Sequence, residues 1–166
     1  MQRTIDGMSD LIAETGITKD DVESIDVEVN HTFAMYMKYP DPVTAAQTRF
    51  SIEHAMAACF LEDRVFLPSF TDEAAQEPRY REFRKRVRMV VHPEWERGYF
   101  PQPAIITVTL KDGRVLKREC VFARGDAGYP VTAKDIDRKY YGGIEFVGVL
   151  SDAQARKGAE LVRSLD

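Results

Sequence analysis

The pattern of hydrophobic and polar positions along the chain predicts several short strands. Over residues 22–30, isoleucine and valine alternate with polar residues, as in a strand with one buried face. The apolar runs AIITVTL (104–110) and VLKRECVF (115–122) flank an Asp-Gly pair, which is the preferred centre of a two-residue hairpin turn. A further strand is expected at 87–91.

Other segments repeat hydrophobic residues at helical spacing. Over residues 4–15 these residues occupy one face, and Gly16 follows as a stop signal. The longest pattern runs over 44–61, where Thr44 is expected to cap a single helix. Gly142–Gly143 is expected to end a late short helix. The remaining helices are expected at 31–39, 72–76, 78–86, 135–141 and 151–165.

The order of these elements is helix, strand, helices, strand, hairpin and helices. It predicts an α+β fold, with an antiparallel sheet of about four strands and helices packed on one face. A doubly wound fold is not expected, because the strands are not followed at regular intervals by a crossover helix and a parallel partner.

The helix expected at 44–61 carries the main candidate for chemistry. His54 lies in its middle on an apolar stripe, beside Ser51 and near Arg49. Imidazole titrates near neutral pH, so His54 could act as an acid, a base or a substrate ligand. The alternative is a buried core histidine whose ring nitrogens are satisfied by hydrogen bonds.

Composition and charge narrow the class of protein. The net charge is −4, so neither nucleic acid nor an anionic membrane is expected as a partner. The basic run 79–88 (RYREFRKRVR) is interpreted as a solvated helix face with an apolar stripe. Cys59 and Cys120 show no metal-ligand spacing and are interpreted as reduced thiols of a cytoplasmic protein. The sequence offers no signal peptide and no stretch long enough to span a membrane.

Five segments, in order, resemble blocks of the MmgE/PrpD family. The segment 44–58 (TAAQTRFSIEHAMAA) is similar to a helical block of that family that contains a Phe-Ser pair. No single block is specific, but five in the right order over nearly the whole chain are specific together. The other four segments lie at 16–27, 86–94, 107–113 and 124–139.

The resemblance implies a fold, an activity and partners. Members of this family include 2-methylcitrate dehydratase, cis-aconitate decarboxylase and iminodisuccinate epimerase. The implied activity is therefore that of a lyase or an isomerase, without cofactor or metal, acting on a small di- or tricarboxylate. Family members are homodimers in which a smaller α+β lid covers a large helical domain. Residues 1–145 would correspond to the lid, and 146–166 to a helical extension that returns to the large domain.

The resemblance also implies which residues contribute to a site, and that this chain carries only part of that site. His54 stands where the family has a tyrosine or a similar group facing the cleft, which implies a catalytic role. Ser51 and Arg49 are candidate substrate-binding residues, although Arg49 points about 140° away from His54 on an unbroken helix. The chain alone is expected to be inactive, because most catalytic groups of the family lie on the large helical domain. That domain would be supplied in cis or in trans, in a homodimer or a hetero-assembly.

A function from another class stays open beside this one. The chain could be a non-catalytic α+β module that mediates assembly or binds a small acid. A lid without its partner should expose an apolar patch of roughly a few hundred Å², whereas a self-sufficient module should not.

Overall fold

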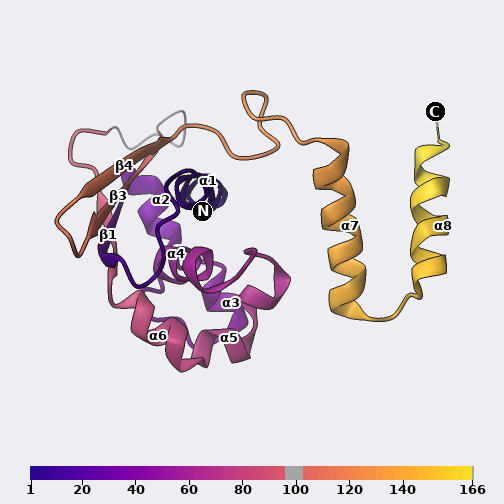
Figure 1. Cartoon of the computed structure of the whole chain (residues 1–166), viewed down its shortest axis with the longest axis horizontal. Helices are drawn as coiled ribbons and strands as arrows, with labels where there is room; N and C mark the ends of the chain where they lie inside the picture. Colours follow the sequence, from indigo (N-terminus) through magenta and orange to yellow (C-terminus); the bar gives the residue numbers. More distant parts are fainter. Residues whose placement is uncertain (96–102, 166) are drawn as a thin grey trace. The chain divides into compact units, whose positions relative to one another are not determined.

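Figure 1 shows the computed structural model of the protein, which describes residues 1–95 and 103–165. The chain forms two compact units, Met1–Tyr129 and Pro130–Asp166. The first unit contains a four-stranded sheet with its helices, and the second contains two helices. No helix in the described ranges is long and apolar enough to cross a membrane.

The sheet of the first unit confirms the expected α+β fold. Its strands run in the order β2-β1-β3-β4. The β1–β3 and β3–β4 pairs are antiparallel, whereas β1 and β2 are parallel. The parallel pair differs from the expected all-antiparallel sheet, because a long helical segment between β1 and β2 returns the chain to the starting end of β1. The bounds are β1 (Val22–Val29), β2 (Val87–Val91), β3 (Ala104–Leu110) and β4 (Val115–Cys120).

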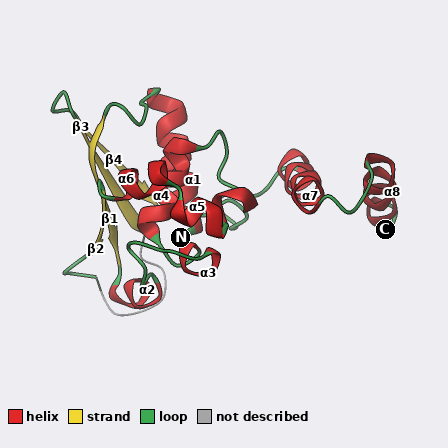
Figure 2. Cartoon of the chain, turned by 90° about the horizontal axis from the view of Figure 1, so that it is seen from below, coloured by secondary structure: helices red, strands yellow, loops and turns green. Residues whose placement is uncertain are grey.

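One face of this sheet is buried under helices. Alternate residues of β1 and β3 point into the core, and the residues between them are only half buried. Helices α1 (Gln2–Thr15) and α4 (Ile52–Leu61) lie on the same side of the sheet (Figure 2). The predicted arrangement of helices on one face is therefore confirmed for these two helices, and the alternating pattern of each strand is its cause.

The remaining helices of the first unit are short. Helix α1 ends at Gly16, which adopts the left-handed conformation (φ 68°), as the sequence predicts. The short helices are α2 (His31–Tyr36), α3 (Ala45–Thr48), the 3-10 helix η1 (Leu67–Phe70), α5 (Asp72–Gln76) and α6 (Pro78–Arg84).

The single helix expected at 44–61 is wrong, because the chain breaks it into α3 and α4. Thr44 caps α3 as expected, since its Oγ1 accepts a hydrogen bond from the Gln47 backbone. Ser51 then adopts an extended backbone (φ −129°, ψ 115°), and its Oγ accepts from the His54 backbone N–H. A side chain that caps a new helix competes with continuation of the old one, which explains the break.

The second unit is a pair of capped helices, α7 (Ala133–Val147) and α8 (Asp152–Arg163). The Tyr140 hydroxyl of α7 donates to the Ala155 carbonyl of α8 at 3.0 Å. The expected stop at Gly142–Gly143 is wrong, because α7 continues until Gly148, which adopts the left-handed conformation (φ 69°). The boundary expected at 145–146 falls inside α7.

Candidate functional site

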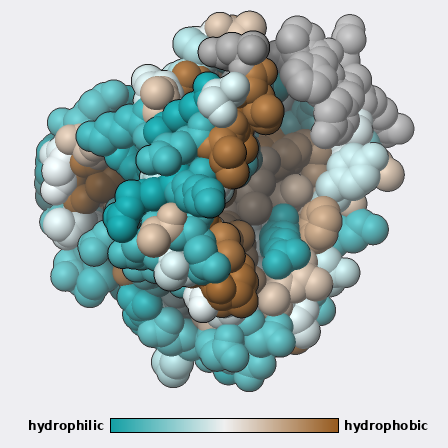
Figure 3. Space-filling model, turned by 90° about the vertical axis from the view of Figure 1, so that its right-hand side faces the viewer, coloured by the Kyte–Doolittle hydropathy of each residue, from teal (hydrophilic) through white to brown (hydrophobic). Residues whose placement is uncertain are grey.

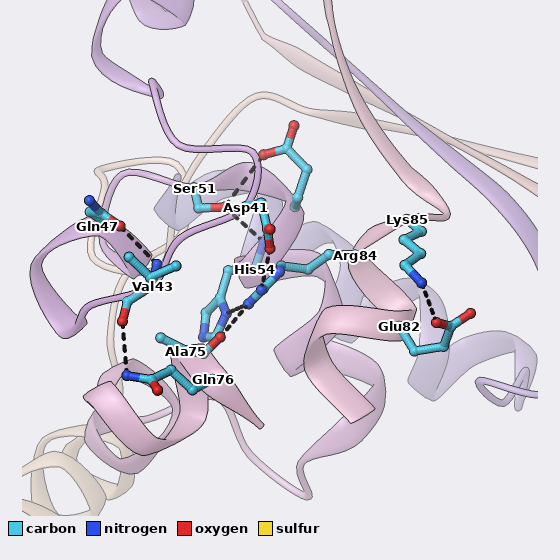
Figure 4. Close-up of polar contacts among 11 residues, drawn as sticks. Asp41, Val43, Gln47, Ser51, His54, Ala75, Gln76, Glu82, Arg84 and Lys85 are labelled. Carbon is cyan, nitrogen blue, oxygen red and sulfur yellow. Dashed lines mark hydrogen bonds and ion pairs between the residues drawn. The ribbon is translucent and has the colours of Figure 1, made fainter. Parts of the chain in front are cut away.

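His54 lies in the centre of the first unit, with no exposed surface. Its Nε2 lies 2.7 Å from the Ser69 carbonyl oxygen, which can only accept, so Nε2 carries the proton. Its Nδ1 then accepts a hydrogen bond from Nη1 of Arg84 at 3.2 Å. Figure 4 shows the contact between Arg84 and the imidazole. Both ring nitrogens are therefore engaged by protein groups, and the network fixes one neutral tautomer.

Aromatic rings complete the surroundings of His54. The ring of Tyr80 stacks on the imidazole, with centroids 4.6 Å apart, and Phe70 lies 6.0 Å away. Burial lowers the pKa of His54 to about 4, and the nearby Arg84 charge acts in the same direction. The ring is consequently neutral at pH 7.

Arg84 is the charged residue that organises this region. Only 3% of it is exposed. Besides His54, its guanidinium donates to the Ala75 carbonyl at 2.9 Å and to Asp41 Oδ1 at 2.5 Å (Figure 4). It therefore joins α4, α5, α6 and the turn that contains Asp41. A buried charge of this kind is stable only when it is paired and hydrogen-bonded.

The sequence interpretation of 79–88 as a solvated face is wrong for Arg84. Tyr80 and Phe83, which form the apolar stripe of α6, are both buried. Arg84 follows Tyr80 by four residues, so it lies on the same helix face. This spacing indicates in the sequence that Arg84 is buried, but the neighbouring basic residues favoured the interpretation of a solvated face.

The structure separates the three predicted site residues. Ser51 is buried as the N-cap of α4, where its Oγ also lies 3.4 Å from the carboxylate of Glu53. Arg49 is exposed just after α3, and its side chain makes no hydrogen bond or ion pair to the described residues. Ser51 thus adjoins His54 through the backbone of α4, whereas Arg49 does not join the cluster.

Two cavities of the first unit have walls that do not include His54. One cavity, of about 220 Å³, opens at the start of α1, where Arg3, Asn30, Phe33 and Asp126 contribute to its walls. Another, of about 310 Å³, lies beside α6. Within residues 1–95 and 103–165, no three side chains of the His, Cys, Asp and Glu types converge as metal ligands.

These features define an α+β domain with one helical layer and a polar network at its centre. Sequence comparison identifies the family. The chain belongs to the MmgE/PrpD C-terminal domain family, whose sequence profile matches residues 1–166. The family expected from the five sequence segments is therefore confirmed.

Two relatives carry the name cis-aconitate decarboxylase. The Mus musculus protein is 25% identical to this chain over 105 residues, and the Homo sapiens protein is 26% identical over 105 residues. Each match covers 63% of this chain but only 22% of the relative. The chain thus matches about a fifth of these relatives.

Proposed function

We propose that this chain is the lid domain of a lyase or isomerase that acts on a small di- or tricarboxylate. Family membership and the similarity to cis-aconitate decarboxylase support the proposal. Reactions beside carboxylates require a base, an acid and cationic clamps, and a closing lid also excludes water. The lid would require a large helical domain, in cis or in trans, within a cytoplasmic homodimer or hetero-assembly that uses no cofactor.

An apolar surface over residues 35–50 is the observation that carries this proposal. The backbone N–H of Tyr39 donates to the Phe50 carbonyl at 3.3 Å, which brings these two residues of the segment together. Large apolar side chains that are exposed near one another favour contact with a partner. Its exposed apolar side chains are Met35, Tyr36, Tyr39, Val43 and Phe50.

The second unit supports the same proposal independently. Helix α7 has an apolar face, yet none of its residues is buried. In α8, Ala155 and Ala159 are buried, whereas Leu161 and Val162 stay exposed. Figure 3 shows hydrophobic side chains at the surface, between hydrophilic ones. We propose that residues 146–166 pack on the large domain and that 1–145 form the lid proper.

The roles of His54, Ser51 and Arg49 stay predictions within this proposal. His54 would donate or accept a proton or clamp a carboxylate, with Ser51 and Arg49 binding substrate. For that, His54 would have to lose its cover of Ser69, Phe70 and Tyr80. Arg49 is exposed already and could contact a carboxylate without any rearrangement.

Reconstitution with a matching helical domain tests the proposed function. The pair should turn over one of 2-methylcitrate, cis-aconitate or iminodisuccinate, followed by proton NMR, while each part alone should be inactive. The double variant Met35→Asp/Phe50→Asp should lose association and activity, because it places charges on the apolar surface. Val115→Asp is the control, since Val115 is equally exposed but lies on β4. A pair that associates but converts none of these substrates would contradict the proposal.

The enclosed position of His54 favours a second candidate, a non-catalytic assembly or acid-binding module. The variant His54→Phe discriminates between the two roles of this residue in a reconstituted enzyme. A large fall in kcat is expected if His54 transfers a proton. Unchanged kcat and KM would leave His54 as a core residue only.

A further inference from the structure

A cavity of about 310 Å³ lies beside α6; His54 does not line it, although Arg84 belongs both to its wall and to the surroundings of the imidazole. Its volume is at the lower end of the range for small-molecule sites. Pro40 and Val87 supply apolar wall, and the rest of the lining is charged. Arg81, Arg84 and Lys85 contribute three cations, and Asp41 and Glu53 contribute two carboxylates.

The carboxylates in this wall are already engaged. The Asp41 carboxylate pairs with Nη2 of Arg84 at 2.5 Å, which offsets part of the charge of each group (Figure 4). Glu53 is 7% exposed, and burial raises the pKa of its carboxyl group. These two groups therefore oppose an entering anion less than two unpaired, ionised carboxylates would.

Arg81 and Lys85 are bound less strongly than Arg84 by carboxylates of the described residues. Arg81 has no ion pair within the described part of the chain. Lys85 pairs with Glu82 at 2.6 Å, but both side chains are more than two-thirds exposed, so this pair is weak. Arg81 and Lys85 lie four residues apart at the end of α6, hence on the same side of the helix.

Arg84, one of the residues of this wall, carries an unsatisfied donor. Its Nη1 and Nη2 are hydrogen-bonded, but its buried Nε has no acceptor. Buried polar groups without a partner are rare and indicate strain or an absent ligand. A guanidinium edge that presents a free N–H suits the oxygens of phosphate or carboxylate.

We propose that this cavity binds a small multivalent oxyanion through Arg81 and Lys85, with Arg84 Nε donating from the inner wall. Phosphate and a tricarboxylate share the required chemistry. The site is separate from the proposed lid function, because it is complete within the first unit.

Titration of the ¹⁵N-labelled chain tests this site directly. The Arg84 Nε–H signal, assigned by its loss in Arg84→Lys, should shift saturably on addition of inorganic phosphate or citrate. Sodium chloride at matched ionic strength should not reproduce the shift. Saturation by phosphate alone would define a phosphate site, and saturation by citrate alone would define a carboxylate site.

Charge variants provide the decisive comparison. Arg81→Gln/Lys85→Gln should weaken binding roughly tenfold, and Glu53→Gln should strengthen it severalfold. Lys117→Gln, an exposed lysine on β4, is the matched control and should leave affinity unchanged. Shifts that follow ionic strength alone, or equal weakening by the Lys117 variant, would overturn the proposal.

Discussion

At the scale of one residue, Arg84 joins several segments of the first unit through the hydrogen bonds of a single side chain. Its guanidinium satisfies a ring nitrogen, a backbone carbonyl and a carboxylate that come from three different segments. Removing such a group leaves His54 Nδ1 and the Ala75 carbonyl without their donor in a place that water does not reach, whereas Asp41 is exposed to solvent. The loss of stability is therefore set by the groups left behind as much as by the interaction itself.

The variant Arg84→Ala should lower the free energy of unfolding by about 3 kcal/mol. It would leave His54 Nδ1 and the Ala75 carbonyl unsatisfied and create a void beside Tyr80. Urea unfolding at pH 7.5 measures the change. Arg81→Ala on the same helix is the control, with an expected change within about 0.5 kcal/mol because Arg81 is exposed. Equal effects of the two substitutions would contradict the central role of Arg84.

His54 should make stability fall with acidification. Its pKa is about 4 in the folded chain and about 6.5 when unfolded, so the unfolded chain binds the extra proton first. Its contribution is complete above pH 6.5 and declines as the pH falls towards 4. Between pH 7.5 and 5 the loss is about 2 kcal/mol.

Comparison with His54→Gln isolates this effect. Other groups titrate in both proteins: Glu53 has a raised pKa and acts in the opposite direction, and it cancels in the difference. The variant should be less stable at pH 7.5 but should show a flatter pH profile. Parallel profiles for the two proteins would show that the imidazole is not buried as a neutral base.

At the scale of elements, the approach of α1 to β4 depends on one glycine. A Cβ atom built on Gly7 would fall well inside van der Waals contact with Cys120 Sγ. Gly7 is itself buried in the middle of α1, where glycine costs about 1 kcal/mol relative to alanine. The close approach therefore outweighs helix propensity at this position.

Gly7→Ala should destabilise the chain by about 2 kcal/mol, because overpacking exceeds the gain in propensity. Gly143→Ala in α7 is the matched control, since a Cβ there would meet no atom within 4 Å. The control should leave α7 equally or more helical, by circular dichroism. The double variant Gly7→Ala/Cys120→Ala should recover part of the loss. A neutral Gly7→Ala would mean that α1 lies farther from β4.

Strands were more predictable from the sequence than the site. The strand at 87–91 was predicted at its observed bounds, and period-two alternation located β1, whose alternate residues are buried. The same reasoning does not apply to helix α4. All residues from Ile52 to Ala58 are buried, so no apolar stripe distinguishes one side of this helix from the other. Thr44 and Ser51 are both good N-cap residues, and Thr44 already explains the start of a helix. The sequence alone therefore did not show that Ser51 begins a second helix.

The hairpin and the surroundings of His54 differ in how much of each depends on residues adjacent in sequence. The Asp-Gly pair correctly predicts the turn between β3 and β4. However, within this turn only Gly113 has a positive φ, and the Leu110 N–H donates to the Arg114 carbonyl, so the loop has three residues and not the expected two. The environment of His54 could not be predicted at all, since Ser69, Tyr80 and Arg84 come from segments distant in sequence.

At the scale of the whole molecule, the two units differ in how they are stabilised. The first has a continuous core that joins α1, α4, α6 and the sheet. The second has two helices, of 15 and 12 residues, that bury chiefly Ala155 and Ala159. Helices of this length are marginal in water unless their apolar faces are covered.

A chain truncated after Tyr129 should therefore fold by itself. Its melting temperature should lie within about 5 °C of that of the full chain, measured by calorimetry. The separate peptide 130–166 should show little helix by circular dichroism in dilute buffer. Cooperative loss of the first unit on truncation would contradict this division of stability.

The central position of β1 has a consequence for synthesis on the ribosome. β1 is translated before either of its neighbours, and five α-helices pass before β2 appears. During that interval both of its edges are open to pairing with other nascent chains. The acidic residues Glu23, Asp26 and Glu28 alternate with its valines and isoleucine. Such charges oppose the stacking of identical strands, so β1 carries its own protection against aggregation until β3 and β2 arrive.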